Sequence, residues 1–237
     1  SVGGQPRNRL ARISADGTLA TAFNPDVNGE VYGLALQAAG AIVLSGNFTT
    51  VGGQTRNRIA RVNASGALEA FDPSANGNVS LVAVQADGKI LAGGAFTAIA
   101  GASRNQLARL NFDGSIDSAF NPAADAPGIV QLQSDGKILV GGTFTTIAGA
   151  ARNNFARLNA DGTLYSAFNP LVDGSVNSLA LQLDGKIVVG GQFATIGGQP
   201  RGRLARLTST GPTSTALTAT PSVVTLTRTG PLPELAW

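Results

Sequence analysis

The sequence predicts an all-β fold, a five-bladed β-propeller of four-stranded antiparallel blades, and three observations lead to this prediction. A motif of about 48 residues recurs along the 237-residue chain,. Each copy holds short runs rich in Val, Ile, Leu and Thr, which are favoured in strands,. Asp-Gly dipeptides separate the runs, and glycine takes the positive φ of a tight hairpin turn without strain,.

Two half-motifs alternate to make the repeat. The first, RNRLARISADGTL in its opening copy, returns with its leading arginine at spacings of 49, 48, 48 and 49 residues, at Arg7, Arg56, Arg104, Arg152 and Arg201. The second reads VNSLALQLDGKIVVGGQF in its last copy. We expect one propeller domain over residues 1–237, with repeats at about 1–48, 49–96, 97–144, 145–193 and 194–237, the last with an irregular C-terminal closing segment.

Each repeat is expected to supply four strands. Around the last repeat these are Thr163–Phe168, Val176–Gln182, Lys186–Phe193 and Arg203–Leu207. Ile187 to Val189 is apolar without alternation, so both faces of the sheet should be buried, as in a blade between two neighbours,. The glycines that end the second strand, Gly94, Gly142 and Gly191, should be required by packing,.

Ring closure follows from where the repeats start and stop. The N-terminal segment offers only third and fourth strands, Asn8–Ser14 and Thr18–Phe23, while the C-terminal segment offers two β-rich runs, Thr215–Thr220 and Val223–Arg228. We expect these to pair, because an unclosed propeller exposes long sheet edges. The alternative is an open array whose edges pair with a missing segment or another subunit.

The combination of LQxDGKIxVGGxF with RNxxARLNxDGxLxxxFNP resembles the delta-60 repeat, a family of bacterial β-propellers in large secreted or surface proteins. The resemblance runs from Ser1 to about Leu207. It implies the propeller fold and a bacterial extracellular or cell-surface location, but it brings no catalytic residues with it. The first repeat departs from the pattern at Ala39-Gly40-Ala41, where Asp and Lys are missing.

Composition narrows the chemistry, because Cys, His and Met are all absent. Thiolate nucleophiles, imidazole acid/base catalysis and Cys/His zinc sites are thereby excluded. Each Asp-Gly loop offers one carboxylate, too few for a calcium cage, so we expect no metal and no cofactor,. The chain is expected not to be an enzyme. A propeller hydrolase, tested through Glu30 and Glu69, ranks last,.

Thirteen of the fourteen arginines lie in the first half-motif. They either form a positive ring for an anionic ligand or tie one blade to the next through bidentate guanidinium contacts. The second role is favoured, above all for the arginines inside the third strand, Arg12, Arg61, Arg109, Arg157 and Arg206. Any ligand should contact the longer loops, and the candidate binding residues are Arg56, Arg104, Arg152, Asn57, Asn105 and Asn153,.

These features predict a non-enzymatic extracellular structural or adhesive module, with a lectin-like glycan-binding propeller as the alternative. Its partner would be a glycan or another surface protein. Nucleic acid is not expected, because aromatic residues do not interleave with the charge,. The uncharged stretch Gly33 to Gln54 is interpreted as a hairpin, so no membrane insertion is expected, and the chain is expected to be a piece of a longer protein or assembly.

Overall fold

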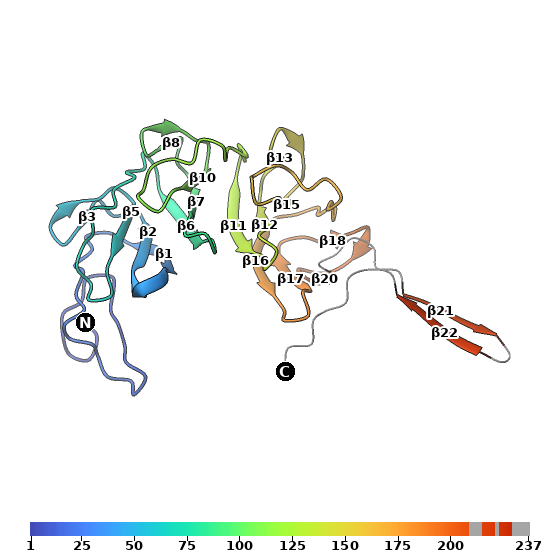
Figure 1. Cartoon of the computed structure of the whole chain (residues 1–237), viewed down its shortest axis with the longest axis horizontal. Coiled ribbons are helices and arrows are strands. Elements are labelled where there is room, and N and C mark those ends of the chain that lie inside the picture. The colour runs from blue at the N-terminus through green and yellow to red at the C-terminus, as the bar shows by residue number, and fades with distance from the viewer. Residues whose placement is uncertain (209–214, 221–222, 229–237) are drawn as a thin grey trace.

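The structure, a computed structural model, describes residues 1–208, 215–220 and 223–228. Its repeats follow one another along a curved arc (Figure 1). Four three-stranded antiparallel sheets, the blades, make up the arc. They are β1 (Val31–Leu36), β2 (Ile42–Gly46) and β5 (Ile59–Val62); β6 (Val79–Val84), β7 (Ile90–Gly94) and β10 (Leu107–Leu110); β11 (Pro127–Leu132), β12 (Ile138–Gly142) and β15 (Phe155–Leu158); and β16 (Val176–Leu181), β17 (Ile187–Gly191) and β20 (Leu204–Leu207).

A short hairpin lies between the second and third strands of each blade, where the sequence predicts only a long loop. The four hairpins are β3 (Thr50–Val51) with β4 (Gln54–Thr55), β8 (Ala98–Ile99) with β9 (Ala102–Ser103), β13 (Thr146–Ile147) with β14 (Ala150–Ala151), and β18 (Thr195–Ile196) with β19 (Gln199–Pro200). A single turn of 3-10 helix, η1 (Ala38–Gly40), replaces the Asp-Gly turn of the first repeat. All-β repeats of antiparallel strands are therefore confirmed.

The hydrophobic core lies between successive blades, as the unbroken apolar runs predict. Val43 and Ile59 of the first blade pack in one cluster with Ile90 and Ala92 of the second, and all four are fully buried. Likewise, Leu91 and Leu107 of the second blade join the cluster of the third. Burial on both faces of a sheet is what the consecutive aliphatic residues of the second strand provide.

The predicted fourth strand does not form as a strand. Residues 163–168 touch the third strand through one bridge, Leu158 to Leu164, and the other repeats repeat this arrangement. The chain then turns, because Phe168 donates its backbone N–H to Tyr165 O at 3.1 Å. That turn carries Phe168 into the core beneath, where its edge meets Phe155 at a ring separation of 5.2 Å. Burial of the aromatic ring thus ends the ladder after one bridge.

The two ends of the chain depart from the predicted closure. Residues 1–30 contain isolated bridges and no strand, so the predicted strands Asn8–Ser14 and Thr18–Phe23 are reduced to one bridge, Ile13 to Leu19. The C-terminal runs do form strands, β21 (Thr215–Thr220) and β22 (Val223–Arg228), but among the described residues they pair only with each other. Figure 1 shows this hairpin extending away from the last blade. The number of blades in a closed ring stays a prediction, and the rest of the closing segment lies outside the described residues.

Every first strand carries a β-bulge at its second residue. In the second blade Val79 opposes Gly94 and Leu81 opposes Gly93, so Ser80 is left without a partner. Gly94 permits this geometry because a Cβ there would overlap Asn78 O and lie 2.8 Å from Ser80 N. The packing role predicted for this glycine is confirmed, and the same close approach occurs at Gly191.

Candidate functional site

The arginines predicted to contact a ligand are engaged within their own repeat. Arg56 donates from Nη1 to Thr55 O at 2.7 Å and from Nη2 to Glu69 O at 2.9 Å. Arg104 and Arg152 make the equivalent pairs of bonds to backbone carbonyls. Each clamps the short hairpin to the segment after the third strand. A ligand role for these three arginines stays a prediction.

The neighbouring asparagines lie at the same loops. Asn57 donates from Nδ2 to Ser74 Oγ at 3.1 Å, which joins the residues before the third strand to the loop that precedes the first strand of the next blade. Asn105 and Asn153 are exposed, and their backbone carbonyls accept from Leu107 and Phe155 at 2.7 Å. The exposed side chains of Asn105 and Asn153 remain available at the surface, and their ligand role also stays a prediction.

The third-strand arginines tie blades together at two junctions, as predicted. Arg61 donates to Phe112 O of the following repeat at 2.7 Å, and Arg109 donates to Ala160 O of the repeat after its own. Both guanidinium groups also lie over phenylalanine rings, with Arg109 Cζ 4.5 Å from the centroid of Phe120. Arg157 lies over the Phe168 ring, at 4.1 Å, whereas Arg206 of the last blade is exposed.

Asp117 is the most heavily paired carboxylate of the described residues. Its Oδ2 accepts from Arg109 Nε and from Lys89 Nζ, both at 2.8 Å. Burial would raise the pKa of Asp117, but the two cationic donors outweigh it and hold the pKa below its usual value,. Asp117 and Arg109 are 8% and 6% exposed, so this pair belongs to the blade interior and not to a binding surface.

A cavity of about 490 Å³ with both polar and apolar lining opens at the hub, where the first strands of all four blades begin. It is lined by the four bulged residues, Tyr32, Ser80, Gly128 and Asn177, together with neutral polar side chains such as Asn78, Gln106 and Thr143. A bulge re-aims the side chain it carries, and bulges are common beside functional sites. Among the described residues lining this hub cavity none is charged.

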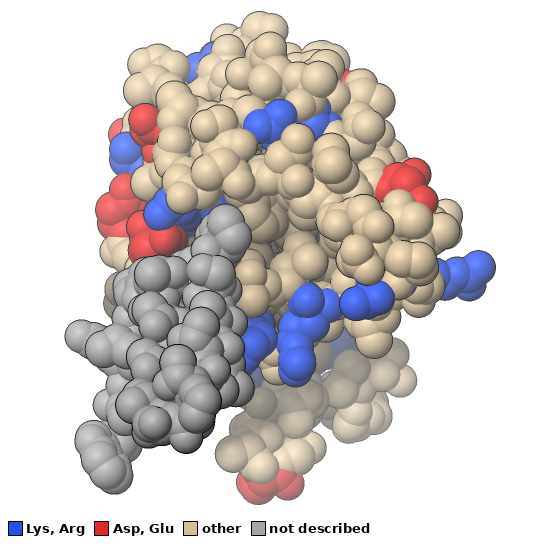
Figure 2. Space-filling view, turned by 90° about the vertical axis from the view of Figure 1, so that its right-hand side faces the viewer, with Lys and Arg blue, Asp and Glu red and all other residues tan. Residues whose placement is uncertain are grey.

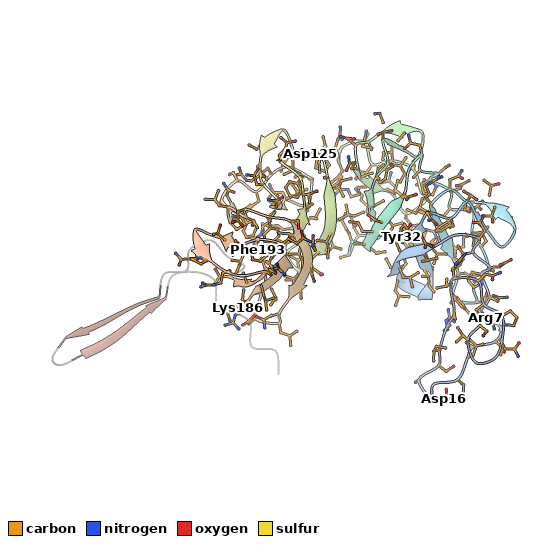
Figure 3. All side chains as sticks on the ribbon, turned by 180° about the vertical axis from the view of Figure 1, so that it is seen from behind. Arg7, Asp16, Tyr32, Asp125, Lys186 and Phe193 are labelled. Atoms are coloured by element: carbon orange, nitrogen blue, oxygen red, sulfur yellow. The ribbon has the colours of Figure 1, made fainter. Side chains whose placement is uncertain are left out.

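Tyr32 is the aromatic residue of the hub cavity. Tyr32 is 46% exposed and lies on the inner side of the arc (Figure 3). The hydroxyl donates to Glu30 Oε2 at 2.9 Å, and Asn47 Nδ2 donates to the same oxygen at 3.0 Å. The hydrogen bond to Glu30 raises the pKa of Tyr32, so the phenol stays protonated and its orientation is fixed.

Sequence reasoning missed these residues although a signal was present. The four repeats agree at their scaffold positions, yet the bulge position reads Tyr, Ser, Gly and Asn in turn. The position two residues before the bulge likewise changes, from Glu30 to Asn78, Ala126 and Ser175. Positions that differ among the repeats and that meet at one cavity are suited to a ligand without rotational symmetry.

The acids considered for hydrolysis serve other contacts. Glu69 pairs with Arg61 Nε at 2.5 Å, and Glu30 holds Tyr32 and Asn47, so no described contact joins the two carboxylates. Within the described ranges, no group of three or more His, Cys, Asp or Glu residues is arranged to hold a metal ion. No helix in the described part of the chain is long and apolar enough to cross a membrane.

The repeated blades and their hub define a β-propeller repeat protein. The family described as "Domain of unknown function (DUF5122) beta-propeller" matches residues 1–23, 37–71, 85–120, 133–168 and 182–211. These ranges cover more than half of the chain, which therefore belongs to this family. The resemblance to the delta-60 repeat is compatible with the membership. No curated protein matches the chain.

Three solved structures illustrate the likeness in fold. A protein of unknown function from Bacteroides caccae is 18% identical with a TM-score of 0.48, over 80% of this chain and 64% of that one. A catalytically inactive virginiamycin B lyase from Staphylococcus aureus is 17% identical with a TM-score of 0.46, over 86% and 57%. A putative gluconolactonase is 18% identical with a TM-score of 0.46, over 94% and 78%. The chain thus spans less than two thirds of the length of the first two.

The expectation that the chain is not an enzyme is contradicted by these comparisons, because the similar structures include a streptogramin B lyase, a virginiamycin B lyase and a putative gluconolactonase. A propeller fold is therefore no ground for excluding catalysis. At 17–20% identity the likeness concerns the fold alone, and it assigns no reaction to this chain,.

Proposed function

We propose that this chain is a bacterial secreted or cell-surface adhesive module that binds a glycan in its hub cavity. The observation that carries the proposal is the convergence of four bulged residues, one from each blade, on a single cavity. The proposal joins the adhesive role and the lectin-like role expected from the sequence.

The chemistry of the lining favours a neutral, hydroxyl-rich ligand. Asn78, Gln106 and Asn177 can each both donate and accept hydrogen bonds, as sugar hydroxyls do,. Tyr32 adds an exposed ring with a fixed hydroxyl, which suits the apolar face and polar rim of a pyranose,. The volume of about 490 Å³ lies within the range of small-molecule sites,. An uncharged lining disfavours phosphate-rich ligands such as nucleic acids,.

A glycan array probed with the intact chain tests the function, and calorimetry with the best glycan tests the site. Tyr32→Ala should weaken binding by roughly tenfold or more, because aromatic residues at the centre of a site commonly contribute over about 1 kcal/mol. Asn177→Ala should weaken it by less.

Asn105→Ala and Asn153→Ala are the matched controls, since both side chains are exposed outside the cavity lining. They should leave affinity unchanged. If they weaken binding while Tyr32→Ala does not, the ligand docks at the arginine-bearing loops. If no glycan binds, the proposal fails.

We also propose that the ring closes with five blades. At inner junctions Ile59 packs with Leu110, and Leu107 packs with Leu158, and all four are fully buried. The corresponding residues at the two ends of the arc are Leu204 and Ile13, which are 64% and 50% exposed.

Leu204 and Ile13 therefore represent the two halves of one further junction between blades, which ring closure would bring together. Figure 2, which faces the C-terminal end of the arc, shows several Lys and Arg side chains there, and the exposed arginines of the last repeat, Arg201, Arg203 and Arg206, belong to this end of the chain.

A further inference from the structure

A second cavity, of about 640 Å³, lies at the opposite mouth of the hub, where the first strands end. Leu36, Val84 and Leu132, the last residues of β1, β6 and β11, all line it. Leu36 is 74% exposed, although the neighbouring blades bury most of their aliphatic side chains. This turn-side cavity is therefore mainly apolar, more so than the hub cavity described above.

One carboxylate on the rim of the turn-side cavity lacks the partner that its equivalents have. Asp135 and Asp184 each pair through Oδ2 with the lysine two residues later, Lys137 and Lys186. At the matching turn of the second blade, Lys89 instead reaches Asp117. Asp87 keeps a hydrogen bond from the Lys89 backbone N–H at 3.1 Å, and it makes no ion pair among the described residues.

The reason lies in the residue seven positions after the end of the third strand, in the segment that follows it. In the second blade that residue is Asp117, whose carboxylate attracts Lys89 across the sheet. In the third blade it is Tyr165, over whose ring Lys137 lies at 5.4 Å while still pairing with Asp135. Asp87 is left as an unneutralised anion beside apolar side chains.

Two glutamines also belong to the wall. Gln85 Oε1 and Gln133 Oε1 are buried without a hydrogen-bond partner, and both glutamines line the turn-side cavity. No Lys or Arg is among the described residues that line it. The exposed carboxylate of Asp87 gives the rim a negative charge, while the three aliphatic side chains offer an apolar surface.

We infer that the turn-side cavity binds a small organic cation, a primary ammonium group carried on an apolar body. The ammonium pairs with Asp87 at the rim, and the apolar body packs on Leu36, Val84 and Leu132. The volume fits a small molecule, since ligand pockets usually span roughly 300–1,000 Å³,. This site is independent of the proposed glycan site, because the two cavities share no lining residue.

Titration of the intact chain with phenethylammonium, followed by NMR or calorimetry, tests the inference, with 2-phenylethanol as the neutral probe of similar shape. We expect saturable millimolar binding of the amine, weaker binding of the alcohol, and loss of the difference at high salt. Asp87→Asn should weaken amine binding by about two- to fivefold, the range for an exposed ion pair, and leave alcohol binding unchanged.

Asp135→Asn is the matched control, because this carboxylate is already paired with Lys137. It should change amine affinity by less than Asp87→Asn does. Leu132→Ser should weaken both probes, with thermal melting used to show that the variant is folded. Equal binding of amine and alcohol, an unaffected Asp87→Asn variant, or no saturable binding overturns the inference, and none of these results bears on glycan binding.

Discussion

Replacing Asp117 with asparagine should destabilise the junction between the second and third blades more than any other single loss of charge among the described residues. The substitution removes the anion shared by Arg109 and Lys89, and it leaves the Arg109 guanidinium, only 6% exposed, without a counter-charge. Removing one partner of a buried ion pair costs about 3–5 kcal/mol. Because Tm falls by roughly 2–4 °C per kcal/mol for a chain of this size, a decrease on the order of 10 °C is expected.

The repeats supply a matched control. Arg157 occupies the position of Arg109 one blade later, but Tyr165 stands where Asp117 does, and the Nε and Nη2 of Arg157 are buried without partners. Burial accordingly lowers the pKa of Arg157. Arg157→Met should therefore cost less than Asp117→Asn, since Arg157 makes no ion pair among the described residues and an apolar side chain of similar length can keep the packing on Phe168,. Equal losses of Tm for Asp117→Asn and Arg157→Met would refute the reasoning.

The same pair predicts how stability depends on pH. The pKa of Asp117 is lower in the folded state than its usual value, so its contribution is present above the unfolded pKa of about 4 and is lost as the pH falls through the folded pKa,. Melting between pH 7 and pH 2 should show a shallower acid limb for Asp117→Asn than for the parent chain. An unchanged acid limb would show that other carboxylates account for acid unfolding.

Two further predictions concern the bulges and the ring. Gly94→Ala should cost on the order of 1–3 kcal/mol in unfolding experiments, because the new Cβ meets the bulged strand near Ser80 N, while Gly202→Ala, with open space around it, should stay within about 0.5 kcal/mol,. Deleting Val223 to Trp237 should lower Tm and promote aggregation if the C-terminal hairpin closes the ring, and an unchanged Tm for a monomeric truncated chain contradicts closure.

Much of the propeller scaffold can be predicted from the sequence, because each structural feature appears in several copies of the repeat. The Asp-Gly turns, the paired apolar runs and the bond from Arg61 to the next blade each recur with the same spacing, so local chemistry and the period agree,. The fourth strand fails as a prediction because its β-rich composition competes with burial of Phe168, which lies only four residues after the bridge at Leu164. Strand propensity alone does not reveal whether strand formation or burial of the phenylalanine ring prevails.

The bulges were beyond sequence reasoning for a different reason. A bulge depends on which residues face each other across two strands, and the pairing of Val79 with Gly94 and Leu81 with Gly93 is a property of register,. The sequence indicated that packing requires the Gly-Gly pair, but it did not indicate the bulge that this pair permits. Only the paired strands show that Ser80 leaves the ladder and faces the hub cavity.

Residues that repeat in every blade and residues that differ between blades therefore suggest different roles in this chain, the first structural and the second functional. Arg56 and its equivalents repeat in every blade, and the bonds that they make to carbonyls explain the repetition without a ligand. The bulge residues Tyr32 and Asn177 repeat in backbone geometry but not in side chain, so the fold fixes where these side chains point and leaves their chemistry free. A ligand that makes different contacts with each blade gives a physical reason for that freedom to be used, which is why the hub cavity, and not the arginine ring, is the site to test first.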